Sequence, residues 1–452
     1  MFDIFWERSL AFLLFWGIWM LAPLAIDATM ALVYMVMVYI FPESKERASI
    51  PDLSYLPYVS VVVPVHNSAD TLFKCLHSIV NQQYPLEKIQ IICVNNGSSD
   101  GSFDIYSQFQ DTYPLTNMNW ISMESAGKSI ALNAGIYMIK GDYIINVDSD
   151  AWLDKYAVLR MVESFEHDPL LVAATGGIHI DKELGKQTRF IDIIHYCEEI
   201  EYLVAFNVGR RYQSLTNNLF TLAGAFSAFR RDVMLKSFMY SERTVSEDTD
   251  LTFHLRQYQM KGQARMACIS SAIAYVEPIS SWSKLYSQRV RWQRGEIEVS
   301  ALYADNNKKF IGGLGNYAGR MLVVDHTLAF SRMTWTFLIP FLYFLGYPLQ
   351  LVLAAFAGLY VCYLILDFLY FLVALREAPV VYRERVKKIW WVMFFLPIYR
   401  FITYWFRLSG ILISMSEPGN WKTENPVQQL REALHSTKNG LLNKVRGFWV
   451  KE

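Results

Sequence analysis

Two acidic residues, Asp148 and Asp150, follow a stretch of the chain in which Tyr143 to Ile145 and Val147 are apolar or β-branched. Such a stretch predicts a buried strand, and residues two apart on a strand point to the same side. Both carboxylates would then lie at the carboxyl edge of a sheet, where open α/β folds bind ligands. Hard oxygen ligands beside a phosphate favour Mg²⁺ or Mn²⁺ over zinc. An Asp-x-Asp pair is equally typical of a turn or a helix cap, so the pair alone does not identify a metal site.

Further charged residues stand at predicted helix starts. Lys128 precedes a predicted helix over Ser129–Ile139. Its ammonium and the free N–H groups of the first turn could bind a diphosphate, and a solvated surface lysine is the alternative. Glu247, Asp248 and Asp250 open another predicted helix. Helix N-termini favour acidic residues, so a capping role is the alternative for at least one of them.

A third group is the run QRVRW, residues 288–292, within a stretch of helical pattern. Two cations and an indole could form an ordinary amphipathic surface. They could also pair guanidinium groups with a pyrophosphate and stack a sugar ring on Trp292. Gly224, in the stretch LAGAF, offers backbone that a ligand can approach closely.

Alternating strands and helices would position these residues. Val59–Val63 and Ile89–Val94 are β-branched runs that predict strands, and Ala69–Gln82 between them has a helical pattern. A further helix is expected directly after Asp150. Alternation of this kind predicts a largely parallel sheet, and the loops after the strand ends, including the one after Val147, would converge at one edge.

Composition limits the classes of protein to consider. The 452 residues exceed one ordinary domain. Hydrophobic residues make up 53% and charged residues 19%, which is too apolar for a purely soluble protein. The net charge of zero gives no electrostatic footprint for nucleic acid. The five cysteines are scattered and contain no CxxC, so we expect free thiols instead of disulfides or a zinc site.

Apolar segments flank the polar middle of the chain. Leu10–Phe41 would be about 48 Å long as one helix, against about 30 Å of hydrocarbon. It predicts two short spans, or an interfacial helix before one span, and it lacks the features of a cleavable signal peptide. Met333–Leu375 is long enough for two spans, and the basic run Arg383–Lys388 then indicates a cytoplasmic face. Ile389–Ser416 is again apolar.

Taken in order, the motifs resemble those of one enzyme family. The stretches VSVVVPVHN, VNNGSSD, GKSIALNAG, VDSD, LAGAFSAFRR, SEDTDLTFHL, VEP and QRVRW run from Val59 to Trp292. This set resembles the membrane-bound processive polysaccharide synthases of glycosyltransferase family 2, which make cellulose, chitin, hyaluronan and poly-N-acetylglucosamine. The resemblance implies an α/β GT-A (Rossmann-like) glycosyltransferase domain in the cytosol, flanked by transmembrane helices. It also implies a nucleotide-diphosphate sugar as donor, with Mg²⁺ or Mn²⁺ as cofactor.

The resemblance also assigns roles to residues. It implies a general base at Asp248, a metal site at Asp148 and Asp150, nucleotide-sugar binding by Pro64, Asn96, Lys128, Asp148 and Arg291, and acceptor binding by Gly224, Glu247, Gln288, Arg289 and Trp292. One stretch departs from the family, because Asn95-Asn96-Gly97-Ser98 stands where Asp-Asp-Gly-Ser is usual. Asn96 still offers a donor and an acceptor to the nucleobase, for which the resemblance implies uracil.

The resulting interpretation has four parts along the chain. Membrane segments occupy 1–50, a cytosolic GT-A domain with interfacial helices 51–332, a C-terminal transmembrane region 333–416, and a charged tail 417–452. We expect a multi-pass plasma-membrane protein with its catalytic domain in the cytoplasm. Its partners would be the nucleotide-sugar donor, the growing polysaccharide acceptor and the lipid bilayer, with no nucleic acid. Accessory export proteins and a homo-oligomer stay open.

The predicted function is an inverting glycosyltransferase that polymerises sugars from a UDP-sugar into an extracellular β-linked polysaccharide and passes it across the membrane. One alternative is a non-processive transferase that adds a single sugar to a lipid carrier; such enzymes typically lack Gln-x-x-Arg-Trp. The other is a catalytically silent scaffold or transport component. The sequence does not choose among glucose, N-acetylglucosamine and glucuronate.

Two arginines lie inside the last apolar segment. Arg400 and Arg407 are seven residues apart, so they share one helical face, and Tyr404 lies between them. Charges at such depth usually face protein or a watery cavity. We expect either that this face lines a polar path for the sugar chain or that the arginines extend to the membrane surface.

Overall fold

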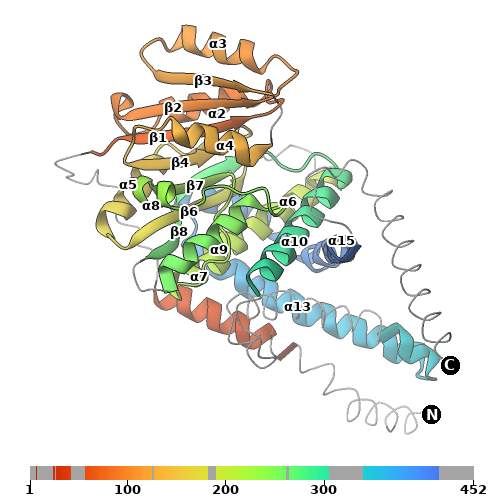
Figure 1. Ribbon diagram of the computed structural model, residues 1–452. Helices are drawn as coiled ribbons and strands as arrows, with labels where there is room; N and C mark the ends of the chain where they lie inside the picture. The colour runs from red at the N-terminus through yellow and green to blue at the C-terminus, as the bar shows by residue number, and fades with distance from the viewer. Residues whose placement is uncertain are drawn as a thin grey trace, which may run out of the picture.

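The computed structural model describes residues 27–41, 56–124, 127–181, 190–260, 264–304 and 339–416, together with Glu7, Leu24 and Ala25. The predicted tail over 417–452 and most of the predicted N-terminal membrane segment therefore lie outside the described residues. One eight-stranded sheet forms the centre of the molecule, in the order β3-β2-β1-β4-β7-β6-β8-β5 (Figure 1). The strands are β1 (Val59–Val65), β2 (Ile89–Asn96), β3 (Asn117–Met123), β4 (Tyr143–Val147), β5 (Ala151–Leu153), β6 (Leu171–Ile180), β7 (Phe226–Arg230) and β8 (Arg265–Val276).

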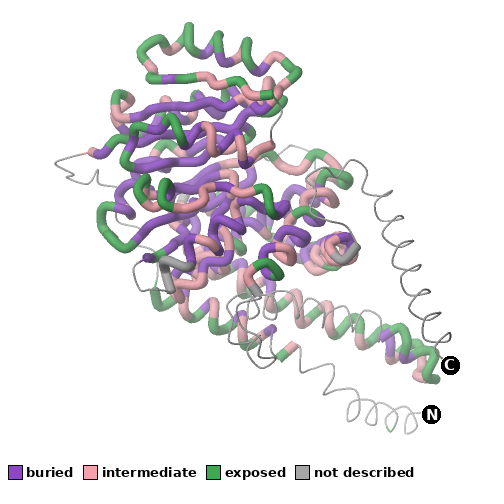
Figure 2. The backbone as a smooth tube through the Cα atoms, viewed as in Figure 1, coloured by how far each residue is buried: buried purple, intermediate pink, exposed green. Residues whose placement is uncertain are grey.

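The first half of the sheet is parallel, as the sequence predicts. β1 pairs in parallel with both β2 and β4, and β2 with β3. Every residue of β1 and β4 is buried, because helices cover both faces of this half, and such strands read as continuous apolar runs. Figure 2 shows the buried backbone running through the sheet and exposed residues along α3 and α13.

The second half of the sheet is mixed, which corrects the expectation of a largely parallel sheet. β7 runs antiparallel to both of its neighbours, β4 and β6. Phe226, the first residue of β7, pairs with Val147, the last residue of β4. The chain that enters β7 therefore lies beside the chain that leaves β4, and this reversal brings Gly224 next to Asp148.

The chain after Asp150 also differs from the expectation of an immediate helix. Ala151–Leu153 form the short strand β5, which pairs antiparallel with β8, and all three residues are buried. The helices described are α2 (Leu72–Val80), α3 (Ser102–Thr112), α4 (Lys128–Tyr137), α5 (Ala157–His167), α6 (Phe190–Val204), α7 (Arg211–Leu215), α8 (Arg231–Lys236), α9 (Glu247–Met260), α10 (Trp282–Ala304), α13 (Leu349–Glu377), α14 (Val380–Lys387) and α15 (Leu396–Ser416). A π-helical turn, η2 (Ala205–Arg210), joins α6 to α7, and two 3₁₀ turns are η1 (Leu86–Lys88) and η5 (Trp390–Phe394).

Of the described part of the chain, α13 is the one helix long and apolar enough to cross a membrane. Only 11% of the most apolar 18-residue stretch of α13 is buried inside the protein, so α13 is not a core helix of the domain. A shorter apolar helix, Asp27–Ile40, lies against it, with Tyr363 Oη donating to Asp27 Oδ2 at 3.0 Å. The multi-pass arrangement stays a prediction.

The arginines of α15 have carboxylate partners. Arg400 forms an ion pair with Asp367 of α13, and Arg407 Nη2 lies 3.7 Å from Glu201 Oε1 of α6. The hydroxyl of Tyr404 is buried and makes no hydrogen bond to any described residue. These carboxylate partners explain why two arginines are tolerated in an apolar helix. No polar path for a sugar chain is needed to account for them. All five cysteines are free thiols, as predicted.

Candidate active site

The loops after β1, β2 and β4 meet at one edge of the sheet. His66 Nδ1 lies 2.9 Å from the carbonyl oxygen of Asn96, and Ser68 Oγ lies 2.7 Å from Ser149 Oγ. The side-chain oxygen of Asn96 accepts a hydrogen bond of 3.0 Å from the backbone N–H of Gly127. These contacts tie the end of β2 to the start of α4 and place both beside the loop of Asp148. The convergence predicted from the strand pattern is therefore present.

Three charged side chains converge on Gly224. A Cβ atom at this position would lie 3.4 Å from Lys128 Nζ, 3.4 Å from Asp248 Oδ2 and 4.0 Å from Asp148 Oδ2. The Gly224 N–H donates to Asp248 Oδ2 at 3.2 Å, and its carbonyl accepts from Asn146 Nδ2 at 2.8 Å. Residues from α4, the β4 loop and α9 thus meet at Gly224, where no side chain separates them.

Lys128 is the cation at this point of convergence. Its Nζ lies 2.7 Å from Asp148 Oδ1 and 3.7 Å from Glu247 Oε1. Burial lowers the pKa of Lys128, but the carboxylates of Asp148 and Glu247 outweigh burial and raise the pKa above its ordinary value. The ammonium therefore stays charged at neutral pH and can bind an anionic diphosphate at the helix start.

Negative charge exceeds positive charge around Lys128. Desolvation by the surrounding protein, together with the charge of Asp148, raises the pKa of Asp150, although Asp150 keeps exposed surface. Burial raises the pKa of Glu247, and the neighbouring Asp248 adds to this effect. A raised pKa means that the ionised form lacks compensating charge. Asp148 and Asp150, as hard oxygen donors in a region short of cations, therefore fit a divalent ion such as Mg²⁺ or Mn²⁺.

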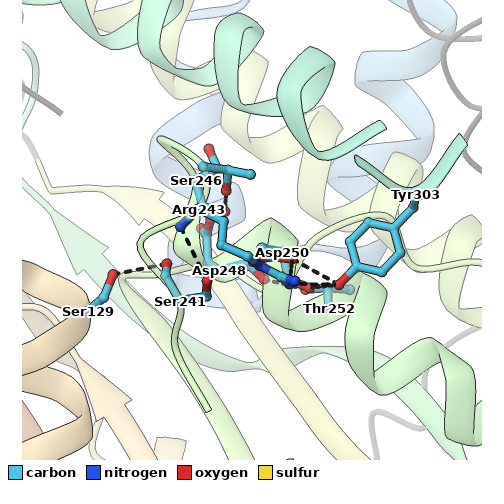
Figure 3. A network of polar contacts seen from close by, with 9 residues as sticks. Ser129, Ser241, Arg243, Ser246, Asp248, Asp250, Thr252 and Tyr303 are labelled. Atoms are coloured by element: carbon cyan, nitrogen blue, oxygen red, sulfur yellow. Dashed lines mark hydrogen bonds and ion pairs between the residues drawn. The ribbon is translucent and has the colours of Figure 1, made fainter. Parts of the chain in front are cut away.

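The start of α9 holds Asp248 and Asp250 in different roles (Figure 3). Asp248 accepts from the N–H of Thr249 at 2.7 Å and from the Gly224 N–H, and its side chain is half-buried. Asp250 is fully buried and accepts from Arg243 Nε at 3.1 Å and from Tyr303 Oη at 2.9 Å. Asp250 therefore ties the preceding loop and the end of α10 to α9, while Asp248 faces the site. Of the acids at the start of α9, Asp250 has a structural role. It forms an ion pair with Arg243, whereas the predicted structural role was that of a helix cap.

Helix α10 is packed tightly against the loop that ends at Glu247. A Cβ on Gly295 would lie 2.0 Å from Ser246 Oγ, so only glycine allows this approach. On α10, Gln288 and Trp292 are half-buried, and the Oε1 of Gln288 has no hydrogen-bond partner among the described residues. Arg291 is exposed and forms no ion pair within the described part of the chain. The exposed guanidinium of Arg291 is available to a ligand.

Arg289 has a different environment from its neighbours on α10. It is buried, and its Nη2 donates to Glu201 Oε2 at 2.6 Å and to Tyr399 Oη at 3.1 Å. Pro64 is buried within β1 at the same edge as Asn96. The structure thus brings together Asn96, Lys128, Asp148, Asp150, Gly224, Glu247 and Asp248, and it places Gln288, Arg291 and Trp292 on the adjoining helix.

Sequence reasoning missed Arg210, Glu201 and Tyr202. The Arg210 guanidinium lies 4.2 Å from the ring centre of Phe206, and its Nη1 is buried without a hydrogen bond to any described residue. Its pKa falls because of burial, although Asp248 and Glu296 are among the groups that raise it. Arg210 ends a π-helical turn, a feature often found at functional sites. No local motif marks this turn, so it could not be predicted from the sequence.

Part of the chain is similar in sequence to a known family, and its fold is similar to a solved structure. Residues 60–238 match the family model described as "Glycosyl transferase family 2". The overall fold is similar to that of a solved structure, a mannosyltransferase from Pyrobaculum calidifontis in complex with GDP-Man and Mn²⁺. The TM-score is 0.54 at 15% identity, over 88% of this chain and 99% of the other. The matched stretch is thus similar to family 2 glycosyltransferases, and the chain has a GT-A-like, Rossmann-type fold with a mixed sheet.

Two curated relatives are similar in sequence. The "Probable glycosyltransferase YdaM" of Bacillus subtilis (strain 168) is 31% identical over 251 residues, which is 55% of this chain and 57% of the relative. The "Poly-beta-1,6-N-acetyl-D-glucosamine synthase" of Staphylococcus aureus (strain MSSA476) is 28% identical over 253 residues, again 55% and 57%. The chain matches over little more than half the length of these relatives. Asp248 and the QRVRW run lie beyond the residues matched by the family model.

Proposed function

We propose that this protein is a membrane-anchored inverting glycosyltransferase that transfers sugar from a UDP-sugar to the end of a growing β-linked polysaccharide. The observation that carries the proposal is the convergence of Lys128, Asp148 and Asp248 on Gly224. Inverting transfer needs a stabilised leaving diphosphate, a base for the acceptor hydroxyl and a shared position for both reactants. A cation, an acid pair and a separate carboxylate around Gly224 would supply these three requirements.

The donor would bind at the edge formed by β1, β2 and α4. Asn96 and Pro64 would contact the nucleoside, and Lys128 would neutralise the diphosphate at the start of α4. A divalent cation held by Asp148 and Asp150 would stabilise the charge that develops on the departing nucleoside diphosphate. Arg291, exposed on α10 without an ion-pair partner among the described residues, would add a second positive charge.

Asp248 would be the general base. Its Oδ2 faces Gly224, and the backbone N–H groups of Gly224 and Thr249, together with the Thr249 hydroxyl at 3.4 Å, hold the carboxylate in one orientation. As the bond to the anomeric carbon forms, this carboxylate would take the proton of the acceptor hydroxyl. Glu247 and Gln288 would orient the acceptor, and Trp292 would stack against its sugar ring.

Extension of a polymer and its passage across the membrane belong to the same proposal. QRVRW on α10 favours repeated transfer over a single addition, and one sequence relative bears the name of a polysaccharide synthase. Arg385 of the basic helix α14 pairs with Glu199 of α6 at 3.1 Å. This contact holds the basic run against the catalytic domain, which is consistent with both facing the cytoplasm.

The test is incubation of membranes containing the full chain with a panel of radiolabelled UDP- and GDP-sugars and Mn²⁺ or Mg²⁺. We expect one UDP-sugar to give a polymer that resists organic extraction and is cleaved by a glycosidase specific for β-linkages. A single labelled sugar in the lipid extract would support the lipid-carrier transferase instead. No turnover of any donor would support the silent scaffold and would contradict the proposal.

A further inference from the structure

A buried set of three side chains links three helices beneath the Trp292 indole. Arg289 Nη2 of α10 lies 2.6 Å from Glu201 Oε2 of α6 and 3.1 Å from Tyr399 Oη of α15. The Tyr399 hydroxyl donates in turn to Glu201 Oε2 at 3.2 Å. We call this closed set the Arg289 triad. The side chain of Arg289 is only 2% exposed, so it lies beneath the surface that a ligand could reach.

The triad is in contact with the Trp292 indole, which we call the acceptor platform because the acceptor sugar is proposed to stack on it. The guanidinium carbon of Arg289 lies 4.7 Å from the centre of the Trp292 ring, within the range of a cation–π interaction. The ring of Tyr202, the neighbour of Glu201 on α6, lies 6.3 Å from the same indole at an interplanar angle of 53°. The indole is therefore held by the Arg289 guanidinium and by the ring of Tyr202, which lies on α6 beside Glu201.

The pair at the centre of the triad is ionised. Burial alone would lower the pKa of Arg289, but Glu201 outweighs it and raises that pKa. Burial alone would raise the pKa of Glu201, but Arg289 and then Arg407 lower it. Such a pair holds its geometry firmly, because moving either charge away leaves the other buried without compensation.

The backbones of α10 and α15 are also in direct contact next to the triad. A Cβ on Gly410 of α15 would lie 2.9 Å from the Val290 carbonyl oxygen and 3.0 Å from Gln293 Cβ of α10. Val290 and Ile413 are both buried in the same apolar contact. This packing holds α15 closely against α10, and the triad joins the two helices at Arg289 and Tyr399.

We propose that Arg289 is a positioning residue that holds the Trp292 indole in the orientation that receives the acceptor sugar, with Glu201 and Tyr399 holding Arg289. The inference rests on the proposed function, since it assigns support to the proposed acceptor site. It gives Arg289 an indirect role in place of direct acceptor contact, because its Nη2 is already bonded to two protein oxygens.

A double-mutant cycle tests the proposal. Arg289→Gln, Trp292→Ala and the double variant of the full chain are assayed in membranes, with UDP-N-acetylglucosamine as donor probe and a short N-acetylglucosamine oligosaccharide as acceptor probe. We expect Arg289→Gln to raise the acceptor KM about tenfold, as partial loss of aromatic stacking does. The donor KM and donor hydrolysis should change less than about twofold. In the Trp292→Ala background the same substitution should add little, because coupled residues are non-additive.

Two further variants separate positioning from stability. Tyr399→Phe removes one partner of Arg289 and leaves no buried charge unpaired, so it should fold and raise the acceptor KM by a smaller factor. Asp367→Asn breaks the ion pair between Arg400 of α15 and α13, which lies outside the triad, and serves as the matched control. It should lower thermal stability and leave the acceptor KM unchanged.

Three results would overturn the positioning role. The first is that the effects of Arg289→Gln and Trp292→Ala on the acceptor KM simply multiply in the double variant. The second is an acceptor KM raised as much by Asp367→Asn as by Arg289→Gln, and the third is an acceptor KM that neither Arg289→Gln nor Tyr399→Phe changes in folded protein. An unmodified chain that turns over no donor in the sugar-nucleotide panel contradicts the proposed function itself. A chain that is active but shows one of the three results contradicts the positioning role alone.

Discussion

Asp248→Asn separates the chemistry of the site from its structure. The two carboxylate oxygens accept from different donors, Oδ1 from the Thr249 N–H at 2.7 Å and Oδ2 from the Gly224 N–H at 3.2 Å. Asparagine has one acceptor oxygen, so one of the two N–H groups would face an amide NH₂ instead. Leaving a buried donor unpaired costs about 1–3 kcal/mol. A measurable but moderate loss of stability is therefore expected even if Asp248 has no catalytic role.

The loss of a general base has a much larger effect on rate. Base catalysis contributes roughly 10²- to 10⁴-fold, and asparagine cannot take the acceptor proton. We expect kcat per folded molecule to fall by that factor while the Kd for UDP stays within a few-fold, because Lys128 and Asp148 remain in place. The measurements are transfer of radiolabelled sugar to acceptor, UDP binding by calorimetry, and thermal unfolding of the same preparation.

Asp250→Asn is the matched control for this experiment. Asp250 lies two residues further along α9, is fully buried, and anchors Arg243 and Tyr303. Its replacement should destabilise the protein at least as much as Asp248→Asn, while kcat per folded molecule stays within a few-fold of the unmodified chain. If Asp250→Asn lowers kcat as much as Asp248→Asn, or if Asp248→Asn transfers sugar at near-normal rate, Asp248 is a structural residue and the mechanism is wrong.

Three further predictions follow from the same geometry. Asp148→Asn, Asp150→Asn or EDTA should each abolish transfer, with Mn²⁺ restoring the EDTA-treated protein, and transfer that persists in EDTA would exclude the metal site. Trp292→Ala should lose about 1–3 kcal/mol of acceptor stacking, so that polymer disappears while donor hydrolysis continues; polymer of unchanged length would contradict this. Burial raises the pKa of Glu198 from 4.5 to about 7, so this group loses on the order of 3 kcal/mol of stabilisation as pH rises from about 4.5 to 7. Glu198→Gln should remove that slope from thermal unfolding between pH 4.5 and 8, whereas an unchanged slope would assign it to other groups.

The sequence by itself determined the local features of the site. β-branched runs predicted β1, β2 and β4, because a strand buried on both faces carries mostly apolar side chains. The polar residues that end these runs, Asn96 and Asp148, had to lie at one edge once the strands were parallel. Lys128 at a helix start and the five free cysteines were likewise readable from neighbouring residues alone.

Only the tertiary structure decided which distant residues meet. The reversed direction of β7 brings Gly224 to the end of β4. There its carbonyl accepts a hydrogen bond from Asn146, which lies 78 positions earlier in the chain. Glu201 meets Arg289 across 88 positions, and this pairing removed Arg289 from the surface where the motif had placed it. The carboxylates that meet Arg400 and Arg407 lie on other helices. Side-chain periodicity encodes which face of an element is buried, but the partner across that face is chosen by packing of the whole chain.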